Sequence, residues 1–371
     1  MNRNLDALQL SGIRAYTNLA KTVEDCALLT LGEPDFDTPE AICQAACQAL
    51  REGKTHYAPN QGIPELRQAI AEKETRRGNP CTQENILITA GATGAIFTAM
   101  LGILNPGDEV ILPMPAFPLY ASVAAVAGAK IVPLCTPDFQ ITEEALSRVL
   151  TEKTRAIILN SPNNPTGSFL TEASLKAVKN AIRGKDIYVI WDGVYQELSS
   201  EILPDLCEDP EMQGKVLLCQ SFSKPYAMTG WRVGYLAAPE AMMKKFLLLH
   251  AAELAAVPTF LQHACLTALE TDISQMVETY ESRRDYVCER LAKMGLPFPQ
   301  PKGAFYVFPD ISRFGLEDSE FCRRLIQEGK VATVPGSCFG APGHIRLSYA
   351  CSMETLKTGL DRLEAFLEVL K

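Results

Sequence analysis

One lysine and one arginine stand close together in a stretch that is otherwise mostly apolar and aromatic. Lys224 lies in the segment SFSKPYAMTGWRVG, residues 221–234, and Arg232 follows it by eight residues. Most lysines lie on solvated helix faces, where the charge needs no particular partner. A lysine among apolar neighbours instead needs an anionic or electrophilic partner, and the surrounding elements indicate what that partner is.

The chain around these cations alternates short β-rich runs with longer helical segments. The runs are ILIT (86–89), EVILP (109–113), AKIVPL (129–134), RAIILN (155–160), IYVIWD (187–192), VLLCQSFS (216–223) and RVGYLAAP (232–239). Most of them are apolar without polar alternation, which is typical of strands covered by helices on both faces. The alternation predicts an α/β fold with a mostly parallel central sheet flanked by helices.

The pattern changes after about residue 240, where long helical periodicity replaces the short runs. A short mixed region then closes the chain, with GAFYVFPD, VATVPGSCF and HIRLSYA. We interpret this part as a smaller α+β domain, joined to the sheet by a helix near residues 270–290. We expect roughly the first 40 residues to pack against it.

Small and polar residues follow several of the predicted strands, at the edge where open α/β sheets bind ligands. They are Gly91, Ala92 and Thr93 after the first run, Asn164 in the turn SPNNPTG, Asp192, Tyr195, Ser221, Ser223 and Lys224. Each has a plainer explanation by itself: a glycine turn, a proline turn, a helix cap, or a lysine that reaches solvent. Their convergence on one edge favours a common ligand.

One ligand, pyridoxal phosphate, would use all of these groups. Lys224 would form a Schiff base with its aldehyde, and burial near Arg232 would lower the pKa of the amine toward the reactive neutral form. The phosphate would take the helix N-terminus that opens at residues 91–93, together with the Ser221 hydroxyl and the Arg232 guanidinium.

The ring of the same cofactor would meet the remaining groups. Asp192 would keep the pyridine nitrogen protonated, which makes the ring an electron sink for a carbanion at the substrate α-carbon. Tyr195 and Asn164 would donate hydrogen bonds to the phenolic oxygen. Phe117, in PMPAFPLY after another strand end, is placed to stack on the ring, and Ser223 completes the expected contacts.

Nine motifs, in order along nearly the whole chain, resemble those of one family. They are LGEPDFDTP, HYAPNQGIPELRQAIA, ITAGATGAI, NPGDEVILPMPAFPLY, NSPNNPTG, DGVYQEL, SFSKPYAMTGWRVGY, GAFYVFPD and VPGSCFG…HIRLSYA. Through them the chain resembles the class I/II aminotransferases of the fold-type I pyridoxal-phosphate enzymes. It is most similar to a bacterial subgroup that handles aspartate, aromatic amino acids or N-acetyl-diaminopimelate.

The resemblance implies further roles and an assembly. Arg346 looks like the bidentate clamp for the substrate α-carboxylate, assisted by Asn164 and the Gly32 backbone. Tyr57 resembles the tyrosine that reaches the cofactor phosphate of the neighbouring subunit, which implies a homodimer with shared sites. The resemblance also implies a large domain over residues 45–275 and a small domain made from residues 1–44 and 276–371.

One position departs from the family pattern. An acidic residue usually follows the pyridine-binding aspartate, whereas Gly193 stands here. Because this position does not contact the cofactor, we expect it to alter loop packing and not the mechanism. Substrate choice is open: Arg14 and Tyr16 would line the side-chain pocket if the N-terminal segment folds over the site, and otherwise belong to a solvated helix.

The implied reaction is a ping-pong transamination through an internal aldimine on Lys224. An L-amino acid gives its amino group to the cofactor and leaves as a 2-oxo acid, and a second 2-oxo acid takes the group up. The alternative on the same fold is a carbon–sulfur β-lyase, which uses the same carbanion but expels a β-thiol. A non-catalytic regulator would need a DNA-binding segment, for which the chain has no spare residues and no basic stretch.

Composition limits the remaining functional classes. The formal net charge of −9 argues against nucleic acid or an anionic membrane as the main partner. The 12 cysteines and four histidines are scattered without metal-ligand spacing, so we expect no metal and mostly reduced thiols. No stretch has the length of an apolar membrane span and the N-terminus has no signal-peptide pattern, so we expect a soluble cytoplasmic protein.

Overall fold

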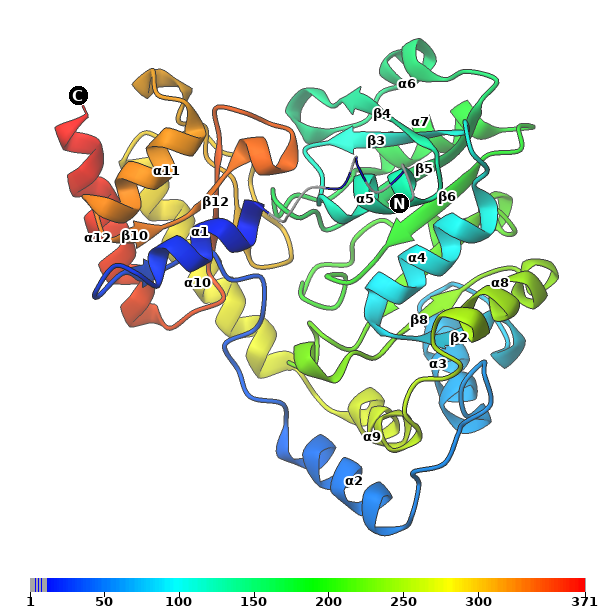
Figure 1. The fold of residues 1–371 in the computed structure, drawn as a ribbon. Coiled ribbons are helices and arrows are strands. Elements are labelled where there is room, and N and C mark those ends of the chain that lie inside the picture. The colour runs from blue at the N-terminus through cyan, green and yellow to red at the C-terminus, as the bar shows by residue number, and fades with distance from the viewer. Residues whose placement is uncertain (1–3, 5, 7, 9–11, 371) are drawn as a thin grey trace.

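A seven-stranded sheet forms the centre of the computed structural model, which describes residues 4, 6, 8 and 12–370 (Figure 1). Its strands, in order across the sheet, are β2 (Ile86–Thr89), β8 (Gly234–Ala237), β7 (Val216–Ser221), β6 (Tyr188–Asp192), β5 (Thr154–Asn160), β3 (Glu109–Met114) and β4 (Lys130–Cys135). β8 runs antiparallel to both of its neighbours, and the other neighbouring pairs are parallel. The prediction of a mostly parallel sheet is therefore confirmed, and each predicted run overlaps one of these strands.

Helices cover both faces of this sheet, which explains why its strands are apolar throughout. In β5, Ala156 and Ile158 belong to one buried layer, whereas Ile157 and Leu159 belong to the other. The first layer includes α4 (Gly91–Ile103), α5 (Leu119–Val126) and α8 (Glu240–Glu253). The second includes α2 (Glu40–Arg51), α3 (Pro64–Arg76), α6 (Glu143–Val149), α7 (Glu172–Ile182) and α9 (Thr259–Glu270).

A smaller α+β part lies beside the sheet and is built from both ends of the chain (Figure 1). Its strands are β1 (Ala27–Leu28), paired with β10 (Val331–Ala332), and the antiparallel set β11 (Val334–Pro335), β12 (Ile345–Ser348) and β9 (Tyr306–Val307). Its helices are α1 (Gly12–Ala20), α10 (Ser274–Lys293), α11 (Asp318–Gln327) and α12 (Met353–Val369). This matches the predicted fold class, while the exact boundaries near residues 44 and 275 stay a prediction.

Contacts between distant segments hold the two parts in place. Arg283 of α10 forms a two-pronged ion pair with Asp35, which fixes the segment that leads from β1 of the smaller part to α2 beside the sheet. Gly167, at the end of the SPNNPTG turn, has φ +69°, and a Cβ there would lie 2.3 Å from the carbonyl oxygen of Tyr306. This close approach of two backbones requires glycine and brings the turn after β5 against the segment that enters β9.

No helix among the described residues is long and apolar enough to cross a membrane. All 12 cysteines lie within the described part, and each is a free thiol.

Candidate active site

A cavity of about 220 Å³ lies at the carboxyl edge of the parallel strands, between the sheet and the smaller part. Most of the predicted site residues line it: Gly32, Ala92, Thr93, Phe117, Asn164, Asp192, Tyr195, Ser221, Ser223, Lys224, Arg232 and Arg346. Two predicted residues do not: Gly91 lies directly beside Ala92, and Tyr57 lies on the surface. The sheet brings the others together because parallel strands end on one side.

One end of the cavity can hold an anion. The N-terminus of α4 opens there at Gly91, and Arg232 donates to the Thr229 carbonyl (2.9 Å) with the Ser223 hydroxyl close by (3.4 Å). Gly91 has φ +67°, and a Cβ on it would lie 2.6 Å from Nη2 of Arg232. The missing side chain therefore lets the guanidinium approach the helix N-terminus, where free N–H groups and the helix dipole favour negative charge.

A buried carboxylate stands across the cavity. Asp192 ends β6 and accepts hydrogen bonds from the Tyr120 hydroxyl (2.6 Å) and the backbone N–H of Val194 (3.3 Å). Burial raises the pKa of Asp192 to about 6, and the hydrogen bond from Tyr120 and the charge of Lys224 partly offset this rise. Asn160, at the end of β5, donates to the Asp192 carbonyl (3.0 Å) and so ties the two strand ends together.

Lys224 follows β7 and points its amine into the same cavity. Its Nζ donates to the carbonyl oxygen of Gly32. Burial lowers the pKa of Lys224 to about 8; the charges of Arg232 and Arg346 lower it further, whereas those of Glu33 and Asp192 raise it. A substantial neutral fraction near pH 8 makes this amine a nucleophile and a base.

Arg346 carries a buried charge without a described acidic partner. The residue lies in β12 and is 1% exposed. Its Nη1 donates to Oδ1 of Asn164 (2.9 Å) and its Nη2 to the Thr30 carbonyl (2.8 Å), while Nε has no partner among the described residues. Burial lowers the pKa of its guanidinium. A cation held by neutral groups at a cavity wall is a site for a carboxylate.

The structure adds residues that the sequence did not single out. Tyr120 holds Asp192, Asn160 accepts from the backbone N–H of Asn164 (2.8 Å), and Tyr306 meets Tyr195 hydroxyl to hydroxyl (3.0 Å). All three stand in quoted motifs, namely PMPAFPLY, RAIILN and GAFYVFPD. Position in a motif is therefore the only signal that could have identified them, because their partners are distant in sequence.

The first helix reaches the cavity through a different side chain from those expected. Ile13 lines the cavity, whereas Arg14 is exposed and the Tyr16 hydroxyl donates to the Ser319 carbonyl (3.4 Å). Of the two possibilities considered for Arg14 and Tyr16, lining the pocket is therefore wrong. Arg14 fails because successive helix residues lie about 100° apart, which turns it away from the face that carries Ile13. Tyr16 lies on nearly the same face as Ile13, but one turn further along it packs against the smaller part and bonds Ser319 of α11.

The departure at Gly193 has a packing explanation. A Cβ there would lie 2.3 Å from Oε1 of Gln196 and 2.7 Å from Nε2 of Gln220. These two amides hydrogen-bond to each other (2.7 Å) in the space that a side chain at residue 193 would occupy. The altered loop packing expected for this position is therefore a glutamine pair that links the loop after β6 to β7.

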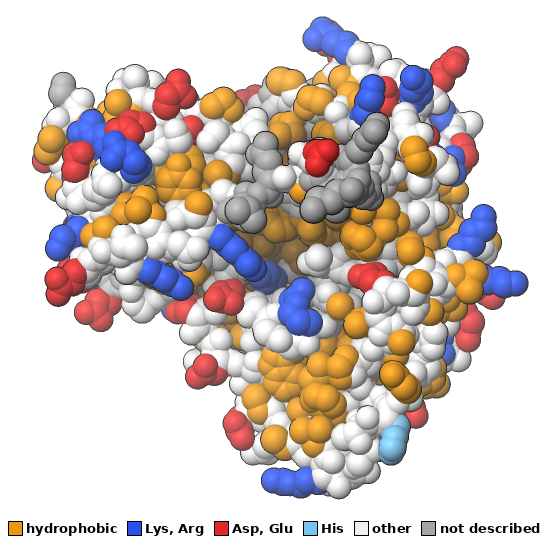
Figure 2. Space-filling model, in the orientation of Figure 1, with side chains coloured by type: hydrophobic (Ala, Val, Ile, Leu, Met, Phe, Trp, Pro, Cys, Tyr) orange, Lys and Arg blue, Asp and Glu red, His pale blue; other side chains and the backbone are white. Residues whose placement is uncertain are grey.

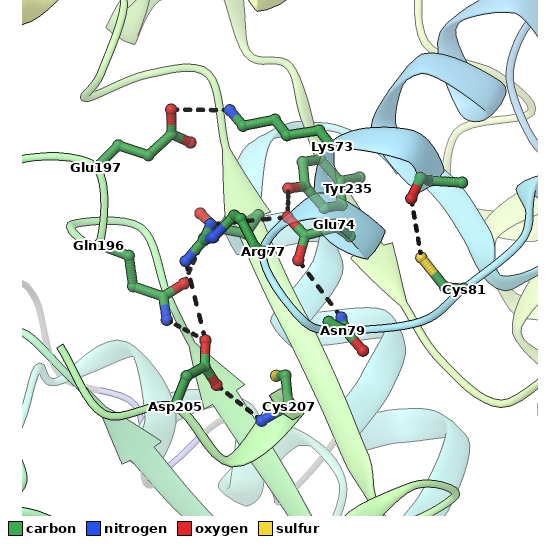
Figure 3. A network of polar contacts seen from close by, with 12 residues as sticks. Lys73, Glu74, Arg77, Asn79, Cys81, Gln196, Glu197, Asp205, Cys207 and Tyr235 are labelled. Carbon is green, nitrogen blue, oxygen red and sulfur yellow. Dashed lines mark hydrogen bonds and ion pairs between the residues drawn. The ribbon is translucent and has the colours of Figure 1, made fainter. Parts of the chain in front are cut away.

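The same loop is anchored by a wider network of polar contacts (Figure 3). Gln196 donates to Asp205, whose carboxylate faces Arg77 at 3.9 Å, and Arg77 in turn faces Glu74 (3.7 Å). Tyr235 of β8 donates to Glu74 at 2.6 Å. The network thus connects the loop that follows Asp192 and carries Tyr195 to α3 and to the sheet.

A buried amine between an anion cradle and an arginine without a described acidic partner suits chemistry on amines and carbonyls. The chain belongs to the aminotransferase class I and II family, whose sequence profile matches residues 24–363. It is therefore an aminotransferase. Among the described residues, no group of three or more His, Cys, Asp or Glu side chains could hold a metal ion.

Individual relatives resemble the chain over almost its whole length. A probable N-acetyl-LL-diaminopimelate aminotransferase of Bacillus subtilis is 39% identical over 99% of this chain and 95% of its own. The aromatic-amino-acid aminotransferase 2 of Thermococcus litoralis is 38% identical over 100% and 99%. The crystal structure of the Thermotoga maritima aspartate aminotransferase superposes with a TM-score of 0.95 at 37% identity, covering 99% of this chain and 100% of that one.

Proposed function

We propose that the protein is a pyridoxal-phosphate-dependent aminotransferase that moves an amino group from an L-amino acid to a 2-oxo acid in a ping-pong sequence. The observation that carries the proposal is Lys224, whose amine has a lowered pKa and faces one cavity with Asp192, the anion cradle and Arg346. When bound, pyridoxal phosphate supplies an aldehyde that condenses with amines and a ring that stabilises negative charge on the substrate α-carbon.

The residues of the cavity fit this cofactor. The N-terminus of α4, the Ser221 and Ser223 hydroxyls and Arg232 suit a dianionic phosphate. Asp192 suits a protonated ring nitrogen, since a cation there would compensate the cost of burying its charge. Tyr195 and Asn164, which also line the cavity, suit a phenolic oxygen, and Phe117 lines the wall beside Tyr120.

Within this function, the chain's own groups divide the work between binding and proton transfer. Arg346 binds the α-carboxylate and so fixes the orientation of the α-carbon. The Nζ amine of Lys224 would take the α-proton of the substrate that Arg346 holds. Asn164 accepts a hydrogen bond from Arg346 through Oδ1, which leaves its amide N–H groups free to donate into the cavity.

The side-chain pocket favours amino acids without a second carboxylate. Its wall includes Ile13, Phe117 and Leu119. The cations that line the cavity in the described part of the chain are Lys224, Arg232 and Arg346. In this proposal they serve proton transfer, phosphate binding and α-carboxylate binding, respectively. The names of the relatives span aspartate, aromatic and N-acetyl-diaminopimelate substrates, so binding of a distal carboxylate would need a cation from elsewhere.

A homodimer with shared sites is part of the proposal. Tyr57 is 92% exposed and does not line the active-site cavity of its own chain, which supports a role at a partner's site. Apolar side chains also gather on the lower part of the face in Figure 2, in the region of α2 and α9. The free thiols support a reducing, cytoplasmic location, and the acidic net charge supports small molecules over nucleic acid or membrane as partners.

A half-reaction without acceptor tests the function. The purified protein, loaded with pyridoxal phosphate, is mixed with single amino acids, and the absorbance of the cofactor is followed. We expect conversion to the pyridoxamine form, fastest with the preferred donors. Release of pyruvate with a thiol, and no such conversion, would instead establish the carbon–sulfur β-lyase. Failure to bind the cofactor at all would exclude both enzymes.

A further inference from the structure

Tyr306 contacts three residues of the site, which are Arg346, Tyr195 and Gly32. It belongs to β9, whose partner strand β12 carries Arg346, and it is 1% exposed. Its side chain lines the cavity. Neither the anion cradle nor the buried carboxylate described above uses this residue.

The ring of Tyr306 supports Arg346. The Cζ atom of the guanidinium lies 4.4 Å from the centre of the ring. Since Arg346 has no described acidic partner, the negative face of the ring is one of the few groups that stabilise its charge. The ring also closes one side of the guanidinium and thereby limits the direction from which a carboxylate can approach.

The hydroxyl of Tyr306 meets the hydroxyl of Tyr195. The two oxygens lie 3.0 Å apart, and neither has another hydrogen-bond partner among the described residues. Two O–H groups that share one hydrogen bond leave one proton free. When Tyr306 donates, the free proton is that of Tyr195 and can be donated into the cavity.

Gly32 makes this arrangement possible. A Cβ on Gly32 would lie 2.8 Å from the Tyr306 hydroxyl. The carbonyl of the same glycine accepts the hydrogen bond from Lys224. One backbone position therefore holds the lysine on one side and leaves room for the phenol on the other.

We propose that Tyr306 is a positioning residue that links carboxylate binding to the phenol beside the cofactor: its ring supports Arg346, and its hydroxyl orients the hydroxyl of Tyr195. The inference rests on the proposed function, because it assigns Tyr195 to the cofactor and Arg346 to the substrate. It predicts that loss of the Tyr306 hydroxyl affects Tyr195, whereas loss of the Tyr306 ring affects carboxylate binding by Arg346.

The first test replaces the hydroxyl alone. Tyr306→Phe keeps the ring, and Tyr349→Phe is the matched control, because Tyr349 is an equally buried phenol that donates to the Ala304 carbonyl and lines no part of the cavity. In the loaded enzyme, Tyr306→Phe should raise the apparent pKa of the cofactor absorbance change by about half a unit or more, since Tyr195 becomes a weaker donor. It should also lower kcat several-fold and change KM less than about twofold.

The second test removes the ring and needs no cofactor. Calorimetry of the binding of 3-phenylpropionate, a monocarboxylate with an apolar side chain, to the cofactor-free full chain compares wild type, Tyr306→Phe and Tyr306→Leu. Arg346→Ala defines the part of this binding that depends on the arginine. Tyr306→Phe should bind within about twofold of wild type, and Tyr306→Leu about five- to tenfold more weakly, the size expected for a buried cation–π contact.

Two outcomes would overturn the inference. If Tyr306→Phe and Tyr349→Phe give the same apparent pKa for the cofactor absorbance change, the Tyr306 hydroxyl does not orient that of Tyr195. If Tyr306→Leu binds 3-phenylpropionate as well as Tyr306→Phe does, the ring does not support Arg346. Should the leucine variant fail to fold, Tyr306→Met replaces it in this comparison. A wild-type protein that takes up no cofactor would refute the proposed function, and the 3-phenylpropionate comparison would still decide the contact between Tyr306 and Arg346.

Discussion

At the scale of single residues, Lys224, Asp192 and Arg346 are three ionisable groups that face one cavity. The pKa of Lys224 falls and that of Asp192 rises, in both cases chiefly because burial disfavours the charged form. Burying these charged groups lowers the free energy of unfolding of the cofactor-free protein. Charged groups of opposite sign on a bound cofactor or substrate would offset this cost. The predictions for these residues follow from that condition.

Replacement of Lys224 by alanine should abolish transamination while the fold is retained. The amine is both the attachment point and the base in the proposed mechanism, so we expect a loss of at least about a thousandfold in kcat. Lys176→Ala, which removes an exposed lysine on α7, is the control. Borohydride reduction and peptide mass spectrometry should find the cofactor on Lys224 in wild type; label on another lysine would refute the assignment.

Replacement of Arg346 by alanine should weaken capture of the α-carboxylate. Because its guanidinium is a buried donor with an unpaired Nε, we expect kcat/KM to fall about a hundredfold, mainly through KM. Arg346→Lys keeps the charge but loses the planar fork and should recover only part of this loss. Steady-state kinetics with one amino donor measure both variants, and unchanged constants in Arg346→Ala would remove the residue from the site.

The raised pKa of Asp192 predicts a pH-dependent cost of folding in the cofactor-free protein. Since its folded-state pKa is about 6, the ionised carboxylate destabilises the fold above that pH, and the penalty disappears as the group is protonated toward pH 4. Asp192→Asn should therefore stabilise the protein at pH 7 by on the order of 3 kcal/mol more than at pH 4. Urea unfolding at the two pH values tests this; an equal effect at both would contradict it.

At the scale of elements, Asp192 ends β6 and Tyr195 lies in the loop that follows, and side-chain contacts fix this loop to its surroundings. Gln196 bonds Gln220 of β7 on one side and Asp205 on the other. Glu197 pairs with Lys73 of α3 at 2.8 Å. The orientation of the two site residues therefore depends on α3 and β7 as well as on β6.

A methyl group at Gly193 should disrupt this loop. Gly193→Ala places its Cβ on the glutamine pair, so we expect destabilisation by about 1–3 kcal/mol and weaker cofactor binding. A double-mutant cycle with Gln196→Ala checks the cause, because removal of one amide relieves the closest clash. The methyl should cost less in the Gln196→Ala background; equal cost in both backgrounds would mean that the backbone, and not the glutamine, excludes it.

At the scale of the whole molecule, the site is assembled from both ends of the chain and, in our proposal, from a second copy. Arg346 near the C-terminus donates to the carbonyl of Thr30 near the N-terminus, a separation of 316 residues. The exposed Tyr57 is the group that we assign to the partner's site.

Mixed dimers test this assignment. Tyr57→Phe alone should weaken cofactor binding about tenfold, the cost of one charge-assisted hydrogen bond. A hybrid of a Tyr57→Phe chain with a Lys224→Ala chain should contain one intact site, formed by Lys224 of the first chain and Tyr57 of the second. Cofactor titration and activity of the purified hybrid measure this; a hybrid that binds as weakly as the Tyr57→Phe homodimer would show that the sites are not shared.

Local sequence patterns were enough to predict the class of fold and most of the site residues. Apolar runs such as RAIILN and IYVIWD specify strands covered on both faces, and the residues that follow them must gather at one edge because parallel strands end together. Asp192, Ser221 and Lys224 could therefore be predicted from local pattern alone.

The other side chains that complete the site could be identified only from the folded chain. Tyr120 and Asp192 are 72 residues apart and Tyr195 and Tyr306 are 111 apart, so no local pattern reports their hydrogen bonds. The choice of Ile13 over Arg14 at the cavity wall likewise depends on how α1 is rotated against its neighbours. Burial and long-range contacts, which set the pKa values of Lys224 and Asp192, exist only once the chain has folded.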